Sequence, residues 1–269
     1  MEERIRQARA RVAQFGWMRI APALFLVFLG AGCAGDAYHP DLNPQRGTLR
    51  AHELPVQGID VSKFQGQVDW KRVRESGIRF AYLKASEGGD RVDPRFQENW
   101  QGAAAAGVSR GAYHFMYWCR PAAEQAAWFA QAVPHDVKQL PPVLDLEWNS
   151  ASPTCPKRLP REEALAEILV MLSLMEQHTG QRPIIYTDIT FHHEVLEGEL
   201  AGYEFWLRSV AAEPEARFRG RSWTFWQYTA TGRVPGIEGD VDRNVFNGSE
   251  REWKRWITRR ATSERDGAV

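Results

Sequence analysis

The chain has few cysteines and no excess of charge of either sign. Its 269 residues include three cysteines, and 34 Lys and Arg residues balance 34 Asp and Glu residues. Without a basic excess, the overall charge gives no reason to expect a nucleic-acid partner. The composition, with 43% hydrophobic and 25% charged residues, is that of a globular protein and excludes a chain that is disordered throughout.

Internal repeats and low-complexity blocks are also lacking, and the apolar run Ile20–Gly32 is too short to span a bilayer comfortably. This run follows an arginine-rich stretch, so the N-terminus has the positive and apolar regions of an export signal. Small residues lead into Cys33, which resembles a bacterial lipoprotein signal, although Gly30 stands where that pattern prefers Leu. We expect residues 1–33 to be an export segment with Cys33 as the lipidation site.

A cleaved signal without a lipid and an uncleaved membrane anchor are the alternatives for this segment. All three put the protein outside the cytoplasm, either in the periplasm, attached to the outer membrane through an N-terminal lipid anchor, or secreted. Besides Cys33, the chain has two cysteines, Cys119 and Cys155. In an oxidising compartment such a pair often forms a disulfide, so a bridge is expected rather than two free buried thiols.

The rest of the chain divides by composition. Residues 34–54 are polar, contain Pro, Gly and Asn, and have no periodic apolar pattern, which is typical of a flexible linker. Residues 55–260 form the expected domain, and residues 261–269 are predicted to be a disordered tail.

Strand-like and helix-like runs alternate within the domain. Strands are expected at Gln57–Ser62, Ile78–Ala85, Ser109–Tyr117, Pro142–Trp148, Pro183–Thr187, Glu204–Val210, Ser222–Tyr228 and Asp240–Phe246. Helices are expected at Trp70–Ser76, Pro94–Ala106, Pro121–Val133, Pro160–His178 and roughly Phe191–Leu200. A helix follows each of the first five strands but none of the last three. The pattern predicts an α/β fold: an irregular TIM-like β/α barrel with eight strands, about five helices and an antiparallel closing section.

The segment PPVLDLEW carries the clearest chemical signal. Because strand side chains alternate between faces, Asp145 and Glu147 share one face while two leucines share the other. Two neighbouring acids raise each other's pKa, so one can stay protonated near neutral pH. A general acid beside a carboxylate is what glycosidic cleavage requires. The alternative is a structural pair that binds arginine or backbone amides.

Two further acids lie in strand-end motifs. Asp60 lies in GIDVSKFQG at the end of the first strand, and Asp242 lies in GDVDRNVFNG in the last. The first and last strands of a barrel are neighbours, so acids at the C-terminal ends of strands 1, 4 and 8 would converge on one mouth. Each Asp alone could instead be a turn or cap residue.

The motifs GIDVSKFQG, FAYLKASEGGD, RGAYHF, LPPVLDLEW, IIYT, FWQY and DVDRNVFNG, in this order, resemble the family 25 glycoside hydrolases. These are bacterial and phage N-acetylmuramidases built on an irregular β/α barrel. The resemblance runs from about Gly58 to Gly248. The spacing of Cys119 and Cys155 also resembles that of the shorter, Gram-negative branch of the family.

The resemblance implies that Glu147 is the general acid and that Asp145 tunes it or supports the reacting sugar. Asp60 and Asp242 match the other two acids. A direct carboxylate nucleophile and assistance by the substrate's N-acetyl group both remain open. The matched positions that line the family's sugar groove are Tyr113, Tyr186, Trp206, Gln227 and Tyr228.

Departures from the family pattern are few. Arg208 stands where Ala is expected, which would alter the sugar contacts on one side of the groove, and Ser86 replaces Thr. Lys84 and Glu87 match a polar pair near the mouth or form an internal salt bridge. His114 has no second His or Cys at ligand spacing, so no metal site and no cofactor are expected.

The resemblance therefore predicts a lysozyme that hydrolyses the β-1,4 bond between N-acetylmuramic acid and N-acetylglucosamine in peptidoglycan. We expect the protein to be a monomer. The alternative is a non-catalytic peptidoglycan-binding lipoprotein on the same barrel. The intact set of four acids favours the enzyme.

Overall fold

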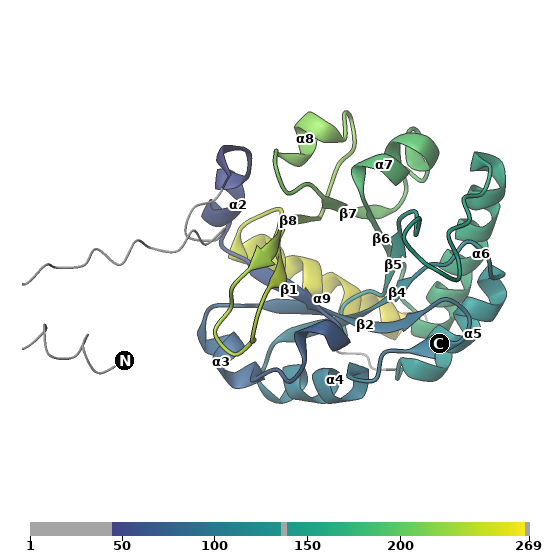
Figure 1. Cartoon of the computed structure of the whole chain (residues 1–269). Coiled ribbons are helices and arrows are strands. Elements are labelled where there is room, and N and C mark those ends of the chain that lie inside the picture. Colours follow the sequence, from purple (N-terminus) through teal and green to yellow (C-terminus); the bar gives the residue numbers. More distant parts are fainter. Residues whose placement is uncertain (1–44, 136–138, 267–269) are drawn as a thin grey trace, which may run out of the picture. The chain divides into compact units, whose positions relative to one another are not determined.

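The computed structural model describes residues 45–135 and 139–266, and the side chains of this part up to residue 259 (Figure 1). The predicted export segment with Cys33, and the linker up to residue 44, lie outside the described residues. Within the described ranges, no helix has the length and apolar character needed to cross a membrane.

Eight strands of the described chain close into a barrel. They are β1 (Gln57–Val61), β2 (Phe80–Glu87), β4 (Ser109–Phe115), β5 (Val143–Leu146), β6 (Ile184–Thr187), β7 (Glu204–Arg208), β8 (Phe225–Gly232) and β9 (Val241–Phe246). Each pairs with the next in this order, and β1 closes the ring by pairing with both β2 and β9. A two-residue strand, β3 (Arg91–Val92), adds to the edge of β2. The predicted eight-stranded α/β barrel is confirmed.

The closing section is antiparallel, as expected, because β9 runs against both β8 and β1 while the other barrel pairs are parallel. One detail of the prediction was wrong: Asp242 lies near the start of its strand and not at the C-terminal end. Since β9 is reversed, its start lies at the same rim as the C-terminal ends of the parallel strands. Asp60 and Asp242 are consequently direct partners across β1 and β9.

Helices follow the first five parallel strands. They are α3 (Trp70–Glu75), α4 (Phe96–Ala105), α5 (Ala122–Ala132), α6 (Arg161–Thr179), and the short α7 (Ile189–Phe191), which continues as the π-helical η3 (His192–Leu196). Figure 1 shows α3 and α4 below the strands and α5 and α6 to the right. The described chain has further helical segments beyond the five expected: η1 (Arg46–Thr48), α2 (Leu49–Glu53), η2 (Lys63–Gln65), α8 (Pro214–Arg217) and α9 (Glu250–Asp266). The last of these runs into the range expected to be a tail.

The second half of the expected linker is folded against the barrel. Thr48 and Ala51 are buried in η1 and α2. The Gln57 side chain of β1 donates hydrogen bonds of 2.8 Å to the carbonyls of Ala51 and Leu54. The interpretation as a flexible linker is therefore wrong for Arg46–Glu53, because burial and these bonds hold the two helices in place.

The alternation of side chains along the strands creates two apolar layers. Outward residues such as Ile59 and Leu144 belong to the core between strands and helices. Inward residues fill the barrel, among them Phe80 and Phe225 at the starts of their strands. The Trp253 ring of α9 contacts Phe80 with 5.4 Å between ring centroids. The N-terminal end of the barrel is thus closed by aromatic side chains, and a pocket lies at the opposite end.

Candidate active site

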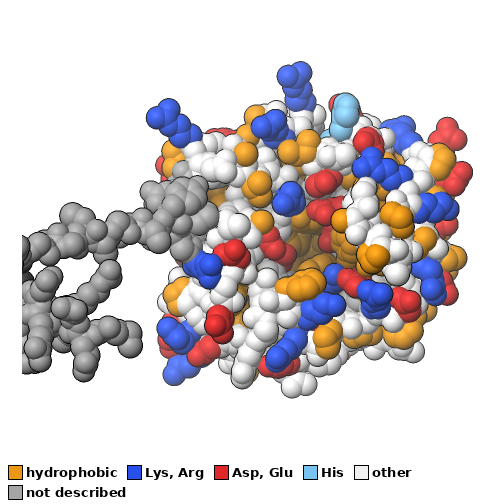
Figure 2. All heavy atoms as spheres, viewed as in Figure 1, with side chains coloured by type: hydrophobic (Ala, Val, Ile, Leu, Met, Phe, Trp, Pro, Cys, Tyr) orange, Lys and Arg blue, Asp and Glu red, His pale blue; other side chains and the backbone are white. Residues whose placement is uncertain are grey.

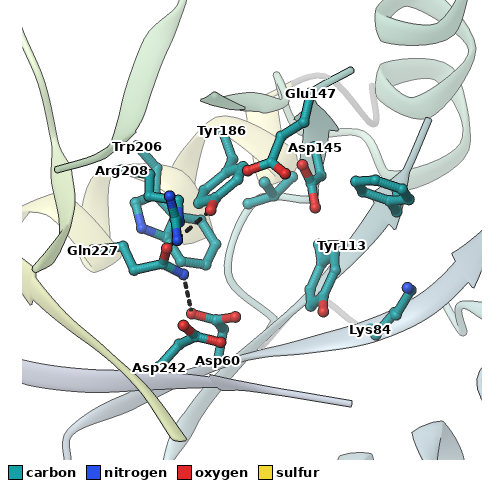
Figure 3. Close-up of a pocket in the computed structure, with 12 residues that line it drawn as sticks. Asp60, Lys84, Tyr113, Asp145, Glu147, Tyr186, Trp206, Arg208, Gln227 and Asp242 are labelled. Atoms are coloured by element: carbon teal, nitrogen blue, oxygen red, sulfur yellow. Dashed lines mark hydrogen bonds between the residues drawn. The ribbon is translucent and has the colours of Figure 1, made fainter. Parts of the chain in front are cut away.

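A pocket of about 420 Å³ occupies the C-terminal end of the barrel. Figure 2 shows a hollow in this face, with Asp and Glu side chains at its edges. Inward positions of the barrel strands line it, so the period-2 pattern of the sequence decides which residues face it. The lining residues are Asp60, Lys84, Tyr113, Phe115, Val143, Asp145, Glu147, Tyr186, Trp206, Arg208, Gln227 and Asp242 (Figure 3).

One acidic pair comes from β5 and the residue that follows it. Asp145 and Glu147 lie two residues apart and both reach the pocket, as the alternation predicts. The Trp118 indole donates a hydrogen bond of 2.7 Å to the main-chain carbonyl of Glu147, which fixes the backbone beyond the strand end. The buried Oδ1 atom of Asp145 has no hydrogen-bond partner in the described part of the chain.

The second pair lies across the pocket on β1 and β9 (Figure 3). Asp60 Oδ2 accepts hydrogen bonds from the side-chain amides of Gln227, at 2.9 Å, and Asn244, at 2.8 Å. Tyr186 donates from its hydroxyl to Gln227 Oε1 at 2.9 Å, and Trp206 donates from its indole to Asn244 Oδ1 at 2.9 Å. These bonds orient both amides so that their NH₂ groups point to Asp60.

All four acids have raised pKa values, mainly because burial disfavours the charged carboxylate. Burial raises the pKa of Asp60 to about 6, although the hydrogen bonds from Asn244 and Gln227 lower it. Burial and the charge of Asp188 raise the pKa of Glu147 to about 6. Burial and Asp60 raise the pKa of Asp242 to about 8, and burial and Glu147 raise the pKa of Asp145 well above its usual range. Near neutral pH the Asp60–Asp242 pair therefore combines a largely ionised carboxylate with a largely protonated carboxyl, and both β5 acids hold their protons to higher pH than isolated carboxyls do.

Most residues expected in the site are brought together. The four acids and Tyr113, Tyr186, Trp206 and Gln227 all line the pocket. Tyr228 is a correction: it is 1% exposed, belongs to the outer core and donates to Gln57 Oε1 at 2.8 Å. Since Gln227 points inward on β8, its neighbour must point outward.

Asn244 and Phe115 belong to the site but were not identified from the sequence. Asn244 lies two residues after Asp242 and therefore shares its face. Phe115 lies two residues after Tyr113 on β4. The polar pair near the mouth is an ion pair, with Lys84 in the pocket wall bound to Glu87.

The expected disulfide is present. Cys119, just after β4, is bonded to Cys155, in the segment between β5 and α6. The bond joins two connections that follow neighbouring strands at the pocket end of the barrel. It is one residue from Trp118, whose indole holds the Glu147 carbonyl.

His114 is a buried residue whose two ring nitrogens both have side-chain hydrogen-bond partners. Its side chain is fully buried between Ser86 Oγ, 2.9 Å from Nδ1, and Gln125 Oε1, 3.0 Å from Nε2. Burial lowers the pKa of His114 to about 4, so the ring is neutral. Over the residues that the structure describes, no group of three or more His, Cys, Asp or Glu side chains is arranged to hold a metal ion.

Glycosidic cleavage needs a carboxylic acid that can protonate the leaving oxygen and a carboxylate that faces the cationic sugar. Acids whose environments hold them in different protonation states supply both roles. The pocket offers two such pairs on opposite walls, at the end of a β/α barrel where catalytic residues collect. Fold and site together define a glycoside hydrolase.

Comparison with known proteins identifies the family within this class of enzymes. The model of the family described as Glycosyl hydrolases family 25 matches residues 59–237. Lysozyme M1 of Streptomyces globisporus is 40% identical over 72% of this chain and 68% of its own. A solved family 25 glycosyl hydrolase from Bacillus anthracis superposes with a TM-score of 0.69 at 33% identity, covering 76% of this chain and 94% of that one. A bacterial lysozyme from Streptomyces coelicolor gives 0.67 at 37% identity, with 77% and 98% covered. The chain belongs to glycosyl hydrolase family 25.

Proposed function

We propose that this enzyme is a lysozyme that hydrolyses the β-1,4 bond between N-acetylmuramic acid and N-acetylglucosamine in peptidoglycan. The observation that carries the proposal is the gathering of Asp60, Asp145, Glu147 and Asp242 in one pocket, all with raised pKa values. The similarity of the chain to Lysozyme M1 and to the Streptomyces coelicolor lysozyme supports the choice of peptidoglycan as substrate.

In this proposal Glu147 is the general acid that protonates the leaving glycosidic oxygen. A pKa of about 6 keeps a substantial share of the side chain protonated in mildly acidic solution. Burial and the charge of Glu147 raise the pKa of Asp145 beside it well above its usual range. The β5 pair therefore retains one proton to a pH at which an isolated carboxyl would be ionised.

Asp60 is the proposed negative charge that faces the reacting sugar. Two amide hydrogen bonds favour its ionised form and fix the direction of the carboxylate. Its partner Asp242, with a pKa of about 8, is protonated at neutral pH and can donate a hydrogen bond to a sugar hydroxyl or N-acetyl carbonyl. Tyr113, Tyr186, Trp206 and Gln227 form the walls that contact the sugar rings.

The test is digestion of purified peptidoglycan followed by mass analysis of the fragments. The wild-type enzyme should release fragments that end in reducing N-acetylmuramic acid. Glu147→Gln is nearly isosteric but cannot donate the proton, so turnover should fall at least ~100-fold. Glu75→Gln, on the exposed face of α3, is the matched control and should digest normally. Fragments that end in N-acetylglucosamine, or full activity of Glu147→Gln, would contradict the proposal.

We also propose that the enzyme is exported and anchored to the outer membrane through a lipid on Cys33. Peptidoglycan lies outside the cytoplasm, and the arginine-rich and apolar stretches before Cys33 support export. Metabolic labelling with a fatty acid should mark the wild-type protein in the membrane fraction. Cys33→Ser should abolish the label and release the protein or block its processing, whereas unlabelled soluble wild-type protein would indicate an ordinary cleaved signal.

A further inference from the structure

Arg208 brings a positive charge into a pocket that is otherwise rich in acids. It is the last residue of β7, and its register partner on β8 is Gln227, the amide that binds Asp60. The side chain is half-buried and lines the pocket. Figure 3 shows it beside Trp206, above Gln227 and the Asp60–Asp242 pair, with Tyr186 and the β5 acids to its right.

The guanidinium of Arg208 is not occupied by an ion pair. Other arginines of the described chain bind carboxylates directly, such as Arg161 to Glu199 at 2.7 Å and Arg158 to Glu194 at 3.1 Å. Among the described residues, no Asp or Glu oxygen lies within 4.0 Å of a guanidinium nitrogen of Arg208. Its charge acts on the acids only through space, where it opposes the burial that raises the pKa values of Asp60, Glu147 and Asp242.

The charge of Arg208 is therefore available to a ligand. Lys84 also lines the pocket but is bound to Glu87, so it offers less to an incoming group. A planar guanidinium matches a carboxylate with two parallel hydrogen bonds, and a half-buried position strengthens such a pair. If Arg208 were absent, an anionic ligand in the pocket would face four carboxyl groups and no unpaired positive charge.

We propose that Arg208 binds a carboxylate of the substrate glycan and makes the enzyme select sugar residues that carry one. This specificity rests on the proposed function, because peptidoglycan strands carry carboxylates whereas neutral N-acetylated glycans do not. The carboxylate is either the lactyl group of muramic acid, which is free where the stem peptide is absent, or the nearest carboxylate of the stem peptide.

The test compares kcat/KM on matched glycan strands. One pair of substrates is peptide-free strands with lactyl carboxylates either free or converted to neutral amides. The other pair is strands that retain stem peptides, with the peptide carboxylates either free or amidated. Wild-type enzyme should prefer the free carboxylate about 10-fold or more in one of the two pairs, the usual range for charge-assisted hydrogen bonds. The pair that shows the preference identifies the source of the carboxylate.

Arg208→Ala should reduce this preference to about one, and Arg208→Lys, which keeps the charge but not the planar fork, should leave an intermediate value. Arg217→Ala, which removes the same charge from an exposed side chain of α8, should retain the wild-type preference. If Arg208 acted only by lowering the pKa values of the acids, its replacement would slow the cleavage of all four substrates alike. Equal wild-type rates on free and amidated strands, or a preference that survives Arg208→Ala, would overturn this inference alone. No cleavage of any strand by the wild type would overturn the proposed function itself.

Discussion

The indole of Trp118 donates a 2.7 Å hydrogen bond to the main-chain carbonyl of Glu147. The donor follows β4 and the acceptor follows β5, so the bond ties together two neighbouring strand ends at the pocket. Trp118 is itself stacked on Phe191, with ring centroids 5.0 Å apart. The backbone that carries the proposed general acid is thus held by a buried aromatic side chain.

Trp118→Phe should lower kcat about 10-fold with little change in KM, because a small displacement of a catalytic group slows the chemical step more than binding. It should also destabilise the fold by about 1 kcal/mol, since a part-buried carbonyl loses its partner. Trp223→Phe is the control, because its indole binds Glu215 on α8, which is not among the pocket-lining residues. Steady-state kinetics and urea unfolding measure both effects. Unchanged kcat in Trp118→Phe would show that this bond does not position Glu147.

Asp145→Asn should move the alkaline limb of the pH–rate profile to lower pH. In the wild type, the β5 pair shares a proton that is retained because the pKa of Asp145 is raised by burial and by Glu147. In the variant Glu147 titrates alone, with a pKa near its value of about 6. Activity should therefore fall as pH rises above about 6, whereas in the wild type the proton shared by the pair can still pass from Asp145 to Glu147 for the catalytic step. Profiles of kcat/KM for the two proteins test this, and superimposable alkaline limbs would refute the coupling.

Much of the fold could be predicted because its signals are local. Each parallel strand is a short apolar run, because the barrel interior and the helices bury both of its faces. The prolines and glycines beside the helices mark the helix ends. The Arg46–Glu53 helices were missed because their stability comes from contact with the barrel, such as the Gln57 bonds, and not from a periodic apolar face. The direction of β9 was likewise foreseen only as an antiparallel section, since strand direction depends on pairing between distant segments.

The site was predictable to the extent that alternation fixes which side chains face the pocket. Asp145 and Glu147 share a face for this reason, and Tyr228 could have been rejected by the same rule once Gln227 was taken as inward. The hydrogen bonds from Gln227 and Asn244 to Asp60 could not be foreseen, because they join β1, β8 and β9. Arg208 was recognised only as a departure in sequence. Its free guanidinium follows from three-dimensional placement.

Asp242→Asn should stabilise the protein more at pH 8 than at pH 4. The pKa of Asp242 is about 8 in the fold against an ordinary value of 3.8, mainly because of burial. The folded state therefore binds a proton that the unfolded state has lost between these limits, so stability falls as pH rises through this window. Asparagine has no proton to lose. The free energy of unfolding that Asp242→Asn adds should therefore be larger at pH 8 than at pH 4 by on the order of 2 kcal/mol, after allowance for partial exposure. The control is the exposed Asp240→Asn, and urea unfolding at both pH values gives the comparison. Equal effects of Asp242→Asn at pH 4 and pH 8 would contradict the raised pKa.

The disulfide between Cys119 and Cys155 should contribute strongly to stability. The two residues are 36 positions apart, and a loop of this length limits the unfolded chain enough to stabilise the fold by roughly 3–4 kcal/mol in the chain-entropy model. The double variant Cys119→Ser/Cys155→Ser, and the wild type after reduction, should both unfold at lower urea concentration by a matching amount. Alkylation of unreduced protein should label neither cysteine.

The same bridge should also protect the site, because Cys119 adjoins Trp118 and its bond to the Glu147 carbonyl. On heating, the reduced enzyme should lose activity at a lower temperature than the oxidised enzyme, and the double variant should follow the reduced curve. Reduction of the double variant itself is the control for other effects of the reductant and should change nothing. If oxidised and reduced wild-type proteins gave identical unfolding curves, the bridge would have no part in stability, and the connections after β4 and β5 would be held by packing alone.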